Sequence, residues 1–335
     1  METVQQSRVG PAWSLTGSAS YRYVSDDPNT QAGNLRGWSQ LYDQLSVGSF
    51  KGEIAGACFG GIHLFCETTN LSLRQSCIVR SNSWWFGIPV SECDSFRIDE
   101  RRVEDGTVAV RRGRQPFELI TPASFRIVGV VIPHKVLVDH LRSVFPDEDA
   151  LERIELGAIQ GHMRANSATR RLFGDVLGEI ARRPEVLQSP SACLAIQGPV
   201  LEAITEMCAS SQQTHEIPRS AMEHAQIVRK VRQFLLDNTD RTISVPELCM
   251  IFKVSRRTLQ YAFDHVLGIG PNAYLKILRL NGVRRDLLRR DIRIPVQQAA
   301  SDWGFWHLSQ FAKDYRTLFD ELPSVTAKRA ERTIL

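Results

Sequence analysis

The sequence lacks the features that mark membrane-spanning and exported proteins. No apolar run among its 335 residues approaches the roughly 18 residues needed to cross a bilayer. Residues 1–6, Met-Glu-Thr-Val-Gln-Gln, contain neither a basic start nor an apolar core, so no signal peptide is expected. Together these absences predict a cytoplasmic protein without a membrane partner.

Patterned cysteines and histidines are missing as well. The seven cysteines are odd in number and contain no Cys-x-x-Cys pair, which favours buried free thiols over disulfides or a metal site. Neither His-x-His, a frequent metal-binding pattern, nor Gly-x-Ser-x-Gly, typical of serine hydrolases, occurs. We therefore expect no catalytic residues, no bound metal and no required cofactor.

Excess charge is small overall but unevenly placed. The net charge of the chain is +4. Residues 222–335 carry 19 Lys and Arg against 12 Asp and Glu, whereas residues 1–221 carry 22 against 25. The length is sufficient for two domains. A basic C-terminal third behind a slightly acidic front is typical of a DNA-binding module joined to a module with another task.

The C-terminal third contains one structural pattern twice. In the first copy, Val245 and Leu248 stand at helical spacing before a short turn, and Leu259 and Phe263 begin a second apolar series after it. Two amphipathic helices joined by a tight turn form a helix-turn-helix. Ser255 stands where the N-cap of the second helix is expected.

The second copy runs from residue 296 through a turn at residues 303–305 to a helix that carries Phe311 and Tyr315. Gly304 suits the turn because glycine enters left-handed backbone conformations without a steric penalty. Leu308 is expected on the buried face of the last helix, with contact to a thymine methyl group as the alternative. Two such units in one all-α domain indicate DNA binding.

The C-terminal hundred residues resemble the AraC/XylS family of bacterial transcription regulators. The resemblance is carried by five motifs in order: Val-Ser-Arg-Arg-Thr-Leu at residues 254–259, Gly-Ile-Gly-Pro at 268–271, Arg-Leu-Asn at 279–281, Trp-Gly-Phe at 303–305 and Phe-Asp-Glu-Leu-Pro at 319–323. It implies a sequence-specific DNA-binding regulator, with RNA polymerase as a partner.

The outward faces of the two recognition helices supply the candidate DNA contacts. Arg can take two acceptors on guanine and Gln can pair with adenine, so Arg257 and Gln260 are expected to read bases. Arg256, nearer the helix start, is expected on a phosphate, and His307 fits either kind of contact. The full set of DNA-binding candidates is Arg256, Arg257, Thr258, Gln260, Tyr261, Arg279, Arg284, His307, Ser309, Gln310, Lys313 and Arg316.

Between the two units, residues 271–290 predict one long helix that opens with proline. Its expected buried face consists of four apolar residues, Ala273, Ile277, Leu280 and Leu287. At roughly 30 Å, the helix nearly matches the ~34 Å between successive major grooves on one side of B-DNA. It would place both recognition helices in adjacent grooves of double-stranded DNA. Its arginines should contact phosphates or pair with Asp286 and Asp291.

The front of the chain has a different pattern. Residues 1–33 are polar and are expected to form a poorly ordered tail, and residues 35–45 show the apolar spacing of a short helix. Segments rich in β-branched and aromatic residues then predict seven strands, at residues 53–59, 61–68, 72–80, 83–90, 107–110, 117–120 and 125–132. Strands at this spacing favour an antiparallel sandwich or barrel, and a jelly roll of the cupin type fits.

Residues 133–211 follow a helical pattern. The apolar stripe through Leu194, Leu201 and Ile204 is either the seam of a homodimer or a face that packs on the barrel. The predicted fold class is α+β. A cupin-like β-sandwich or barrel with flanking helices would form an effector-sensing and dimerisation domain over residues 34–211. A linker over residues 212–224 leads to an all-α DNA-binding domain over residues 225–335.

Over most of the chain there is a closer resemblance, to regulators of ethanolamine-utilisation operons. It rests on motifs such as Gly-Trp-Ser-Gln-Leu-Tyr-Asp-Gln-Leu at residues 37–45 and Asn-Ser-Trp-Trp-Phe-Gly-Ile-Pro at 82–89. It implies an activator that responds to ethanolamine together with adenosylcobalamin. An amino alcohol is a cation at neutral pH, so its site needs a carboxylate or an aromatic face. The effector-binding candidates are Glu53, Glu67, Trp84 and Trp85.

Two other interpretations compete with an effector-responsive regulator. A DNA-binding or architectural factor that needs no ligand would share the same C-terminal domain. A cupin-type metalloenzyme fused to a DNA-binding domain would need several metal ligands, and His63 stands alone in its segment with Glu67 four residues on. The two tryptophans also have a simpler interpretation, as core residues.

Overall fold

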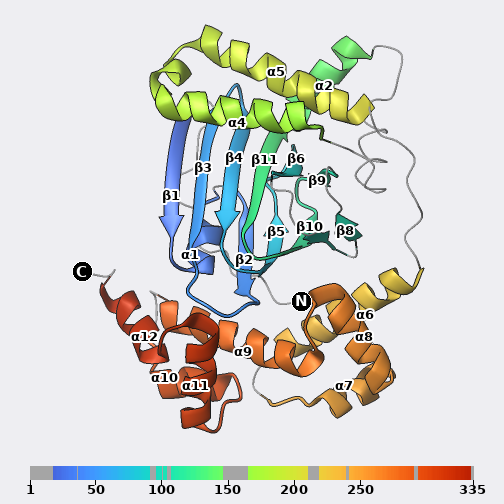
Figure 1. The fold of residues 1–335 in the computed structure, drawn as a ribbon, viewed down its shortest axis with the longest axis vertical. Coiled ribbons are helices and arrows are strands. Elements are labelled where there is room, and N and C mark those ends of the chain that lie inside the picture. Colours follow the sequence, from blue (N-terminus) through green and yellow to red (C-terminus); the bar gives the residue numbers. More distant parts are fainter. Residues whose placement is uncertain are drawn as a thin grey trace.

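A computed structural model describes residues 18–35, 37–90, 96–99, 101–103, 107–145, 165–209, 219–238, 241–289 and 293–332. The first half of this chain is a β-sandwich and the last third is all-helical, so the fold is α+β (Figure 1). None of the helices among these residues is both long and apolar enough to cross a membrane. The six cysteines that the structure describes are free thiols, four of them buried and two half-buried.

Two antiparallel sheets make up the sandwich. The strands are β1 (Ala19–Ser25), β2 (Ser39–Gln44), β3 (Gly52–Phe59), β4 (Ile62–Thr69), β5 (Leu73–Ile78), β6 (Ser83–Pro89), β7 (Phe96–Ile98), β8 (Arg101–Val103), β9 (Ala109–Arg112), β10 (Pro116–Thr121) and β11 (Phe125–Pro133). One sheet has the order β1-β3-β4-β11-β6-β9, and the other has the order β2-β5-β10-β7-β8. All seven predicted strands exist, with ends shifted by at most two residues. The cupin type specifically stays a prediction.

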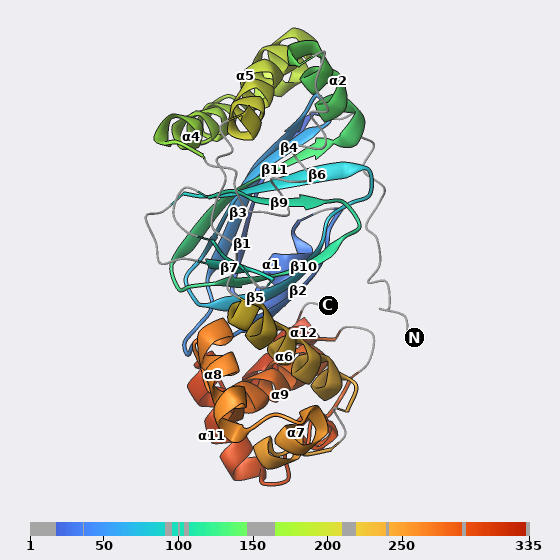
Figure 2. The same cartoon turned by 90° about the vertical axis from the view of Figure 1, so that its right-hand side faces the viewer.

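Both faces of the six-stranded sheet are apolar, because one packs on the second sheet and the other on helices. Its inner face contributes Phe65 and Trp85 to a core shared with the second sheet. Its outer face contributes Leu64, Trp84 and Phe86 to a second core shared with helices. Those helices are α2 (His134–Val144), α4 (Ser167–Arg182), the short 3-10 helix η1 (Pro184–Gln188) and α5 (Pro190–Ala209). They lie at one end of the sandwich, and the C-terminal domain lies at the other (Figure 2).

The predicted disordered tail over residues 1–33 is wrong for its second half. Residues 19–25 form β1, which pairs along its whole length with β3, from Ala19 opposite Cys58 to Ser25 opposite Gly52. Residues 28–33 form helix α1 (Pro28–Gly33), whose N-cap Asp27 accepts hydrogen bonds from the two following free amides. The order comes from a partner strand far along the chain, which local polarity does not reveal. Residues 1–17 lie outside the described part.

The helix expected over residues 35–45 is also wrong, because residues 39–44 form strand β2, paired with β5. Tyr42 fits a strand as well as a helix, since its burial comes from tertiary contacts. Part of the predicted linker is wrong too. Helix α6 (Arg219–Leu236) begins inside residues 212–224, because its apolar residues Ala225 and Val228 pack in the C-terminal core. Leu194 of the supposed stripe on α5 is 66% exposed.

Seven helices form the C-terminal domain. They are α6, α7 (Val245–Phe252), α8 (Arg256–Leu267), α9 (Pro271–Leu288), α10 (Val296–Asp302), α11 (Leu308–Phe319) and α12 (Pro323–Arg332), among the residues described. Two apolar clusters divide the domain, one around α6 to α8 and one around α10 to α12, and α9 contributes to both. The long helix α9 therefore joins two small helical units into one body.

Candidate nucleic-acid interface

The first helix-turn-helix unit consists of α7 and α8, as predicted. Ser244 and Glu247 form a reciprocal capping box at the start of α7. Lys253 takes a left-handed conformation that ends α7, and Ser255 then caps α8 by accepting a hydrogen bond from the Thr258 amide at 3.0 Å. Local signals thus fix both the turn and the start of the recognition helix.

The outward face of α8 is open to solvent. Arg256, Arg257, Gln260 and Tyr261 are exposed, whereas Leu259 and its apolar companions are buried. Thr258 is half-buried. The Arg257 guanidinium lies 5.4 Å from the centre of the Tyr261 ring, a cation–π distance that holds the arginine extended along the helix surface. Gln260 donates a hydrogen bond to Asp264 at 2.8 Å.

The second unit consists of α10 and α11, joined by a turn at Gly304, which has φ of +75°. The unit is anchored to α9 by Trp303, whose ring nitrogen donates to Asp286 at 2.6 Å. Gly282 of α9 is required there, because a Cβ at this position would lie 2.3 Å from the Trp303 ring. Asp286 therefore binds the tryptophan, and the pairing of α9 arginines with Asp286 or Asp291 stays a prediction.

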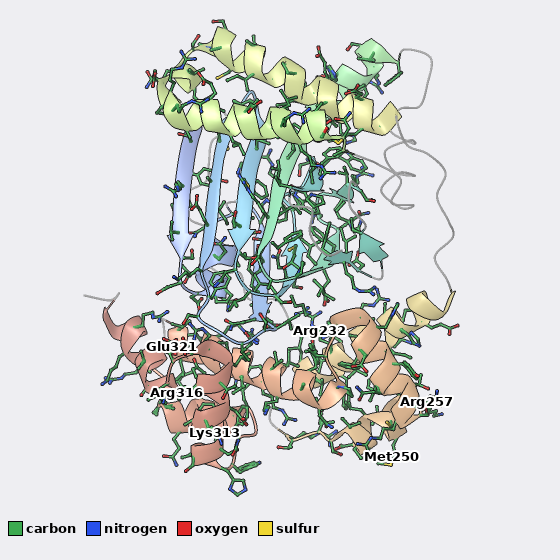
Figure 3. The ribbon with its side chains drawn as sticks, viewed as in Figure 1. Arg232, Met250, Arg257, Lys313, Arg316 and Glu321 are labelled. Atoms are coloured by element: carbon green, nitrogen blue, oxygen red, sulfur yellow. The ribbon has the colours of Figure 1, made fainter. Side chains whose placement is uncertain are left out.

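The candidate contacts of the second unit are also exposed: His307, Ser309, Gln310, Lys313 and Arg316. A surface hollow of about 440 Å³ lies beside α11 and is lined by Ala312, Lys313, Arg316, Thr317, Asp320 and Leu322. Figure 3 shows Arg257 on the first unit, and Lys313 and Arg316 on the second. Two polar faces, one from each unit, are thus left open.

The expectation that Leu308 belongs to the core is wrong, since its side chain is 41% exposed at the start of α11. Trp306, which the sequence analysis did not single out, is 69% exposed immediately before it. These two apolar residues flank His307 at the end of α11 where a recognition helix enters a groove. A large aromatic directly after the turn motif was the signal that could have identified Trp306.

Helix α9 differs from the phosphate-binding rod that was expected. Arg284 is only 4% exposed and forms ion pairs with Asp27, at 2.7 Å, and Glu321, at 2.6 Å. Its assignment as a DNA contact is therefore wrong, because acidic residues far along the chain surround it. Arg285 pairs with Asp43 of strand β2.

Arg279 of α9 is half-buried and donates a hydrogen bond to the Ile243 carbonyl at 3.4 Å. Burial lowers the pKa of its guanidinium. Its role in DNA binding stays a prediction. The predicted buried face of α9 is also corrected at Ala273, which is exposed, whereas Leu280 and Leu287 are buried. The helix ends at Leu288, two residues before the predicted end.

The four effector-binding candidates do not come together. Trp84 and Trp85 are adjacent on β6 and face opposite sides of the sheet. Trp84 donates to His134 at 3.0 Å on the helix-covered face, and Trp85 stacks on Phe117 inside the sandwich. Both are core residues. The two tryptophans cannot share one ligand, because successive side chains of a strand alternate between its faces.

The two acidic candidates are also separated. Glu53 lies at the surface and forms a bidentate pair with Arg22, at 2.8 and 2.9 Å. Glu67 is buried inside the sandwich, where it accepts hydrogen bonds from Gln31 and Tyr42 at 3.2 Å. Burial raises the pKa of Glu67 to about 7, and the two hydrogen bonds oppose that rise.

The remaining features concern metal binding. His63 is buried with its ring 2.6 Å from the Tyr21 hydroxyl, and burial lowers its pKa to about 3. Within the described ranges, no group of three or more His, Cys, Asp or Glu side chains is placed to hold a metal ion.

The arrangement of its helices makes the C-terminal domain a DNA-binding domain with two helix-turn-helix units. The model of the family described as "Helix-turn-helix domain" matches residues 248–329. This match, and the similarity to the relatives below, agree with the resemblance of the C-terminal hundred residues to AraC/XylS transcription regulators.

The relatives have similar C-terminal domains and differ in how much of the chain they share. The XylDLEGF operon transcriptional activator of Pseudomonas putida is 32% identical over 106 residues, which are 31% of this chain and 33% of that one. The match thus spans about a third of the length of this relative. The transcriptional activator NphR of Rhodococcus sp is 26% identical over 294 residues, 84% of this chain and 82% of its own. Among solved structures, the AraC-like transcriptional activator CuxR has 14% identity and a TM-score of 0.39, with 78% of this chain and 94% of that chain covered.

Proposed function

We propose that this protein is a sequence-specific transcription activator that binds operator DNA through α8 and α11. The observation that carries the proposal is the pair of recognition helices whose polar faces stay open while the rest of each helix is buried. Activators of transcription among the relatives support the direction of regulation. RNA polymerase is then the expected protein partner.

The roles of the side chains follow from their positions. Arg257 and Gln260 on the open face of α8 are the base-reading residues, and Arg256 at the helix start contacts phosphate. In the second unit, Gln310 and Lys313 face the groove from α11. Tyr261, Thr258, Ser309, His307 and Arg316 complete the interface.

The two units would lie in adjacent major grooves. Helix α9 has 18 residues, or about 27 Å at the usual rise, against ~34 Å between successive grooves on one face of B-DNA. Hydroxyl-radical footprinting of the full chain on its operator tests the proposal. The expected result is two protected segments about one helical turn apart. Protection of a single segment would contradict the two-groove arrangement.

For the effector, the proposal follows the resemblance to the ethanolamine-utilisation operon regulator EutR. Ethanolamine, together with adenosylcobalamin, is the expected signal, and Glu67 is the candidate with the most suitable environment. An ammonium group beside Glu67 would favour its carboxylate form, so binding would release a proton from a group whose pKa is raised to about 7. Glu53 is already paired with Arg22 at the surface.

Calorimetry on the intact protein tests this proposal, with ethanolamine and adenosylcobalamin added singly and together. We expect heat of binding with the wild type and its loss in Glu67→Gln. Glu53→Gln is the matched control, since it removes a carboxylate from the same pair of strands at the surface. No heat in any combination, together with unchanged operator affinity, would favour a DNA-binding factor that needs no ligand.

Dimerisation is a further part of the proposed function. The exposed Leu194 on α5 lies on the helical layer at the end of the sandwich away from the DNA-binding domain. A homodimer through this layer would leave both recognition helices free. Sedimentation of the wild type and of Leu194→Glu tests it, with a dimer expected for the first and a monomer for the second.

A further inference from the structure

The end of strand β2 and the residue after it pack against the C-terminal domain at helix α9, which joins the two helix-turn-helix units. Gln44 and Leu45 are neighbours there, and both are buried. Gln44 is bound by the second unit, and Leu45 belongs to the apolar cluster of the first unit. Both residues are part of the front domain, so two successive residues link it to the second unit and to the apolar cluster of the first.

Gln44 completes the C-terminus of recognition helix α11. The last four carbonyl groups of a helix have no partner within it. At the end of α11, the Arg316 carbonyl is capped by the Asp320 amide, but the Leu318 carbonyl is bound by the front domain. The Gln44 side-chain amide donates to it at 2.7 Å and the Gly48 amide at 2.9 Å.

The same residue is held in place by α9. The Gln44 backbone amide donates to the Asn281 side-chain oxygen at 2.9 Å, and the Asn281 amide group donates to the Gln44 carbonyl at 3.0 Å. Asn281 is 1% exposed. The Ser49 hydroxyl adds a surface contact by donating to Asp320 at 2.8 Å. The β2–β3 turn is therefore fixed to the connecting helix and to the end of α11.

Leu45 joins the apolar cluster of the first unit. It shares an apolar cluster with Leu259 and Phe263 of recognition helix α8 and with Leu278 of α9. It is 6% exposed, and it is the buried residue that the sandwich contributes to this cluster. Removing its side chain would leave a cavity in the cluster that supports α8, while leaving the hydrogen bonds at α11 intact.

We propose that Gln44 is a positioning residue for recognition helix α11, and Leu45 for recognition helix α8. The front domain thereby fixes the orientation of the two recognition helices relative to each other. A recognition helix must enter its groove within a small angular and translational tolerance, so a displaced helix loses its own half of the operator. This inference rests on the proposed two-groove binding of DNA.

Two readouts on the full chain test the inference. In hydroxyl-radical footprints, we expect Gln44→Met to reduce protection of the α11 segment and to lower operator affinity about tenfold, because the Leu318 carbonyl loses one of its two donors and keeps only the Gly48 amide. Leu45→Ala should instead reduce protection of the α8 segment. Lys313→Ala and Arg257→Ala identify which segment belongs to which helix.

Hydrogen exchange of the free protein supplies the readout that is independent of DNA. Gln44→Met should speed exchange in residues 308–319 and leave residues 256–267 unchanged, and Leu45→Ala should do the reverse. If Gln44→Met fails to fold, Ser49→Ala, which removes the surface contact alone, should give a smaller change confined to residues 308–319.

Equal loss of both segments in Gln44→Met, or equal exchange in both helices, would overturn the inference. So would unchanged exchange in residues 308–319. A wild type that protects no operator segment, while its variants still show the helix-specific exchange, would defeat the proposed function and leave the positioning roles in place.

Discussion

Asp27 and Arg284, 257 positions apart, form an ion pair that is almost completely buried between the two domains. One carboxylate oxygen of Asp27 caps helix α1, and the other accepts from the arginine at 2.7 Å. The same guanidinium pairs with Glu321 and lies 4.7 Å from the centre of the Phe319 ring. Arg284 thus links the sandwich to the end of recognition helix α11.

Arg284→Ala should therefore destabilise the protein. Asp27 would be left with a buried charge that has no cationic partner, which costs about 3–5 kcal/mol in comparable cases, whereas Glu321 would keep its pair with Arg329. Urea unfolding followed by circular dichroism measures the change. Arg22→Ala is the control, because the Arg22–Glu53 pair is exposed and its loss should change stability little. A stable Arg284→Ala protein with weakened DNA binding would restore Arg284 to the DNA interface.

Arg257→Ala should lower affinity for the operator and relax the preference at one base pair. The loss of a bidentate contact to a base is expected to cost about 1–3 kcal/mol. Gel-shift titrations on the operator and on random duplex measure it. Arg182→Ala, at an exposed position on α4, is the control for a lost surface charge. Equal weakening on both duplexes would place Arg257 on a phosphate.

Lys313→Ala should weaken operator binding less than Arg257→Ala does. Arg257 on α8 can make two hydrogen bonds to one base, whereas Lys313 on α11 binds as a point charge. The face of α11 therefore has fewer groups that can bind a base twice. The same titrations compare the two variants, and thermal melting should show no difference between them. A larger loss in Lys313→Ala would make the second unit the main reader of the operator.

Glu67→Gln should reduce the dependence of stability on pH. Burial raises the pKa of Glu67 from 4.5 to about 7, so between these values the folded chain retains a proton that the unfolded chain has released. The stability from this group is complete below 4.5 and is lost as pH rises through about 7. Melting temperatures across this range should fall less in Glu67→Gln than in the wild type. Parallel curves would show that Glu67 titrates normally.

The sequence predicted the helix-turn-helix units because their signals are local. Ser255 caps α8 from the adjacent position, and Gly304 takes the left-handed turn that its residue type suggested. The seven strands with dense β-branched and aromatic residues were equally visible. Strand β1 was missed because its polar residues are ordered by pairing with β3, whose partner residues follow 27 to 39 positions later in the sequence.

The wrong assignment of Arg284 also arises from partners that are distant in sequence. Arg284 has the sequence context of a DNA-contacting arginine, and only the fold brings Asp27 and Glu321 beside it. The tryptophan pair is different, since adjacent residues of a predicted strand must face opposite ways. That separation of Trp84 from Trp85 could have been deduced before the structure was known.

The pairing of α9 arginines with the front domain changes how many cations the protein offers to DNA. Arg284 and Arg285 are counted in the basic balance of the C-terminal third, yet Asp27 and Asp43 already occupy them. A C-terminal fragment cut free from the sandwich would regain the Arg285 cation, while Arg284 would keep its pair with Glu321. If Arg285 then met a phosphate, it would displace a further counterion and steepen the logarithmic dependence of affinity on salt by about 0.9. The intact chain should then bind bulk genomic DNA less tightly than its own excised fragment does. More of the intact protein therefore stays available for the operator.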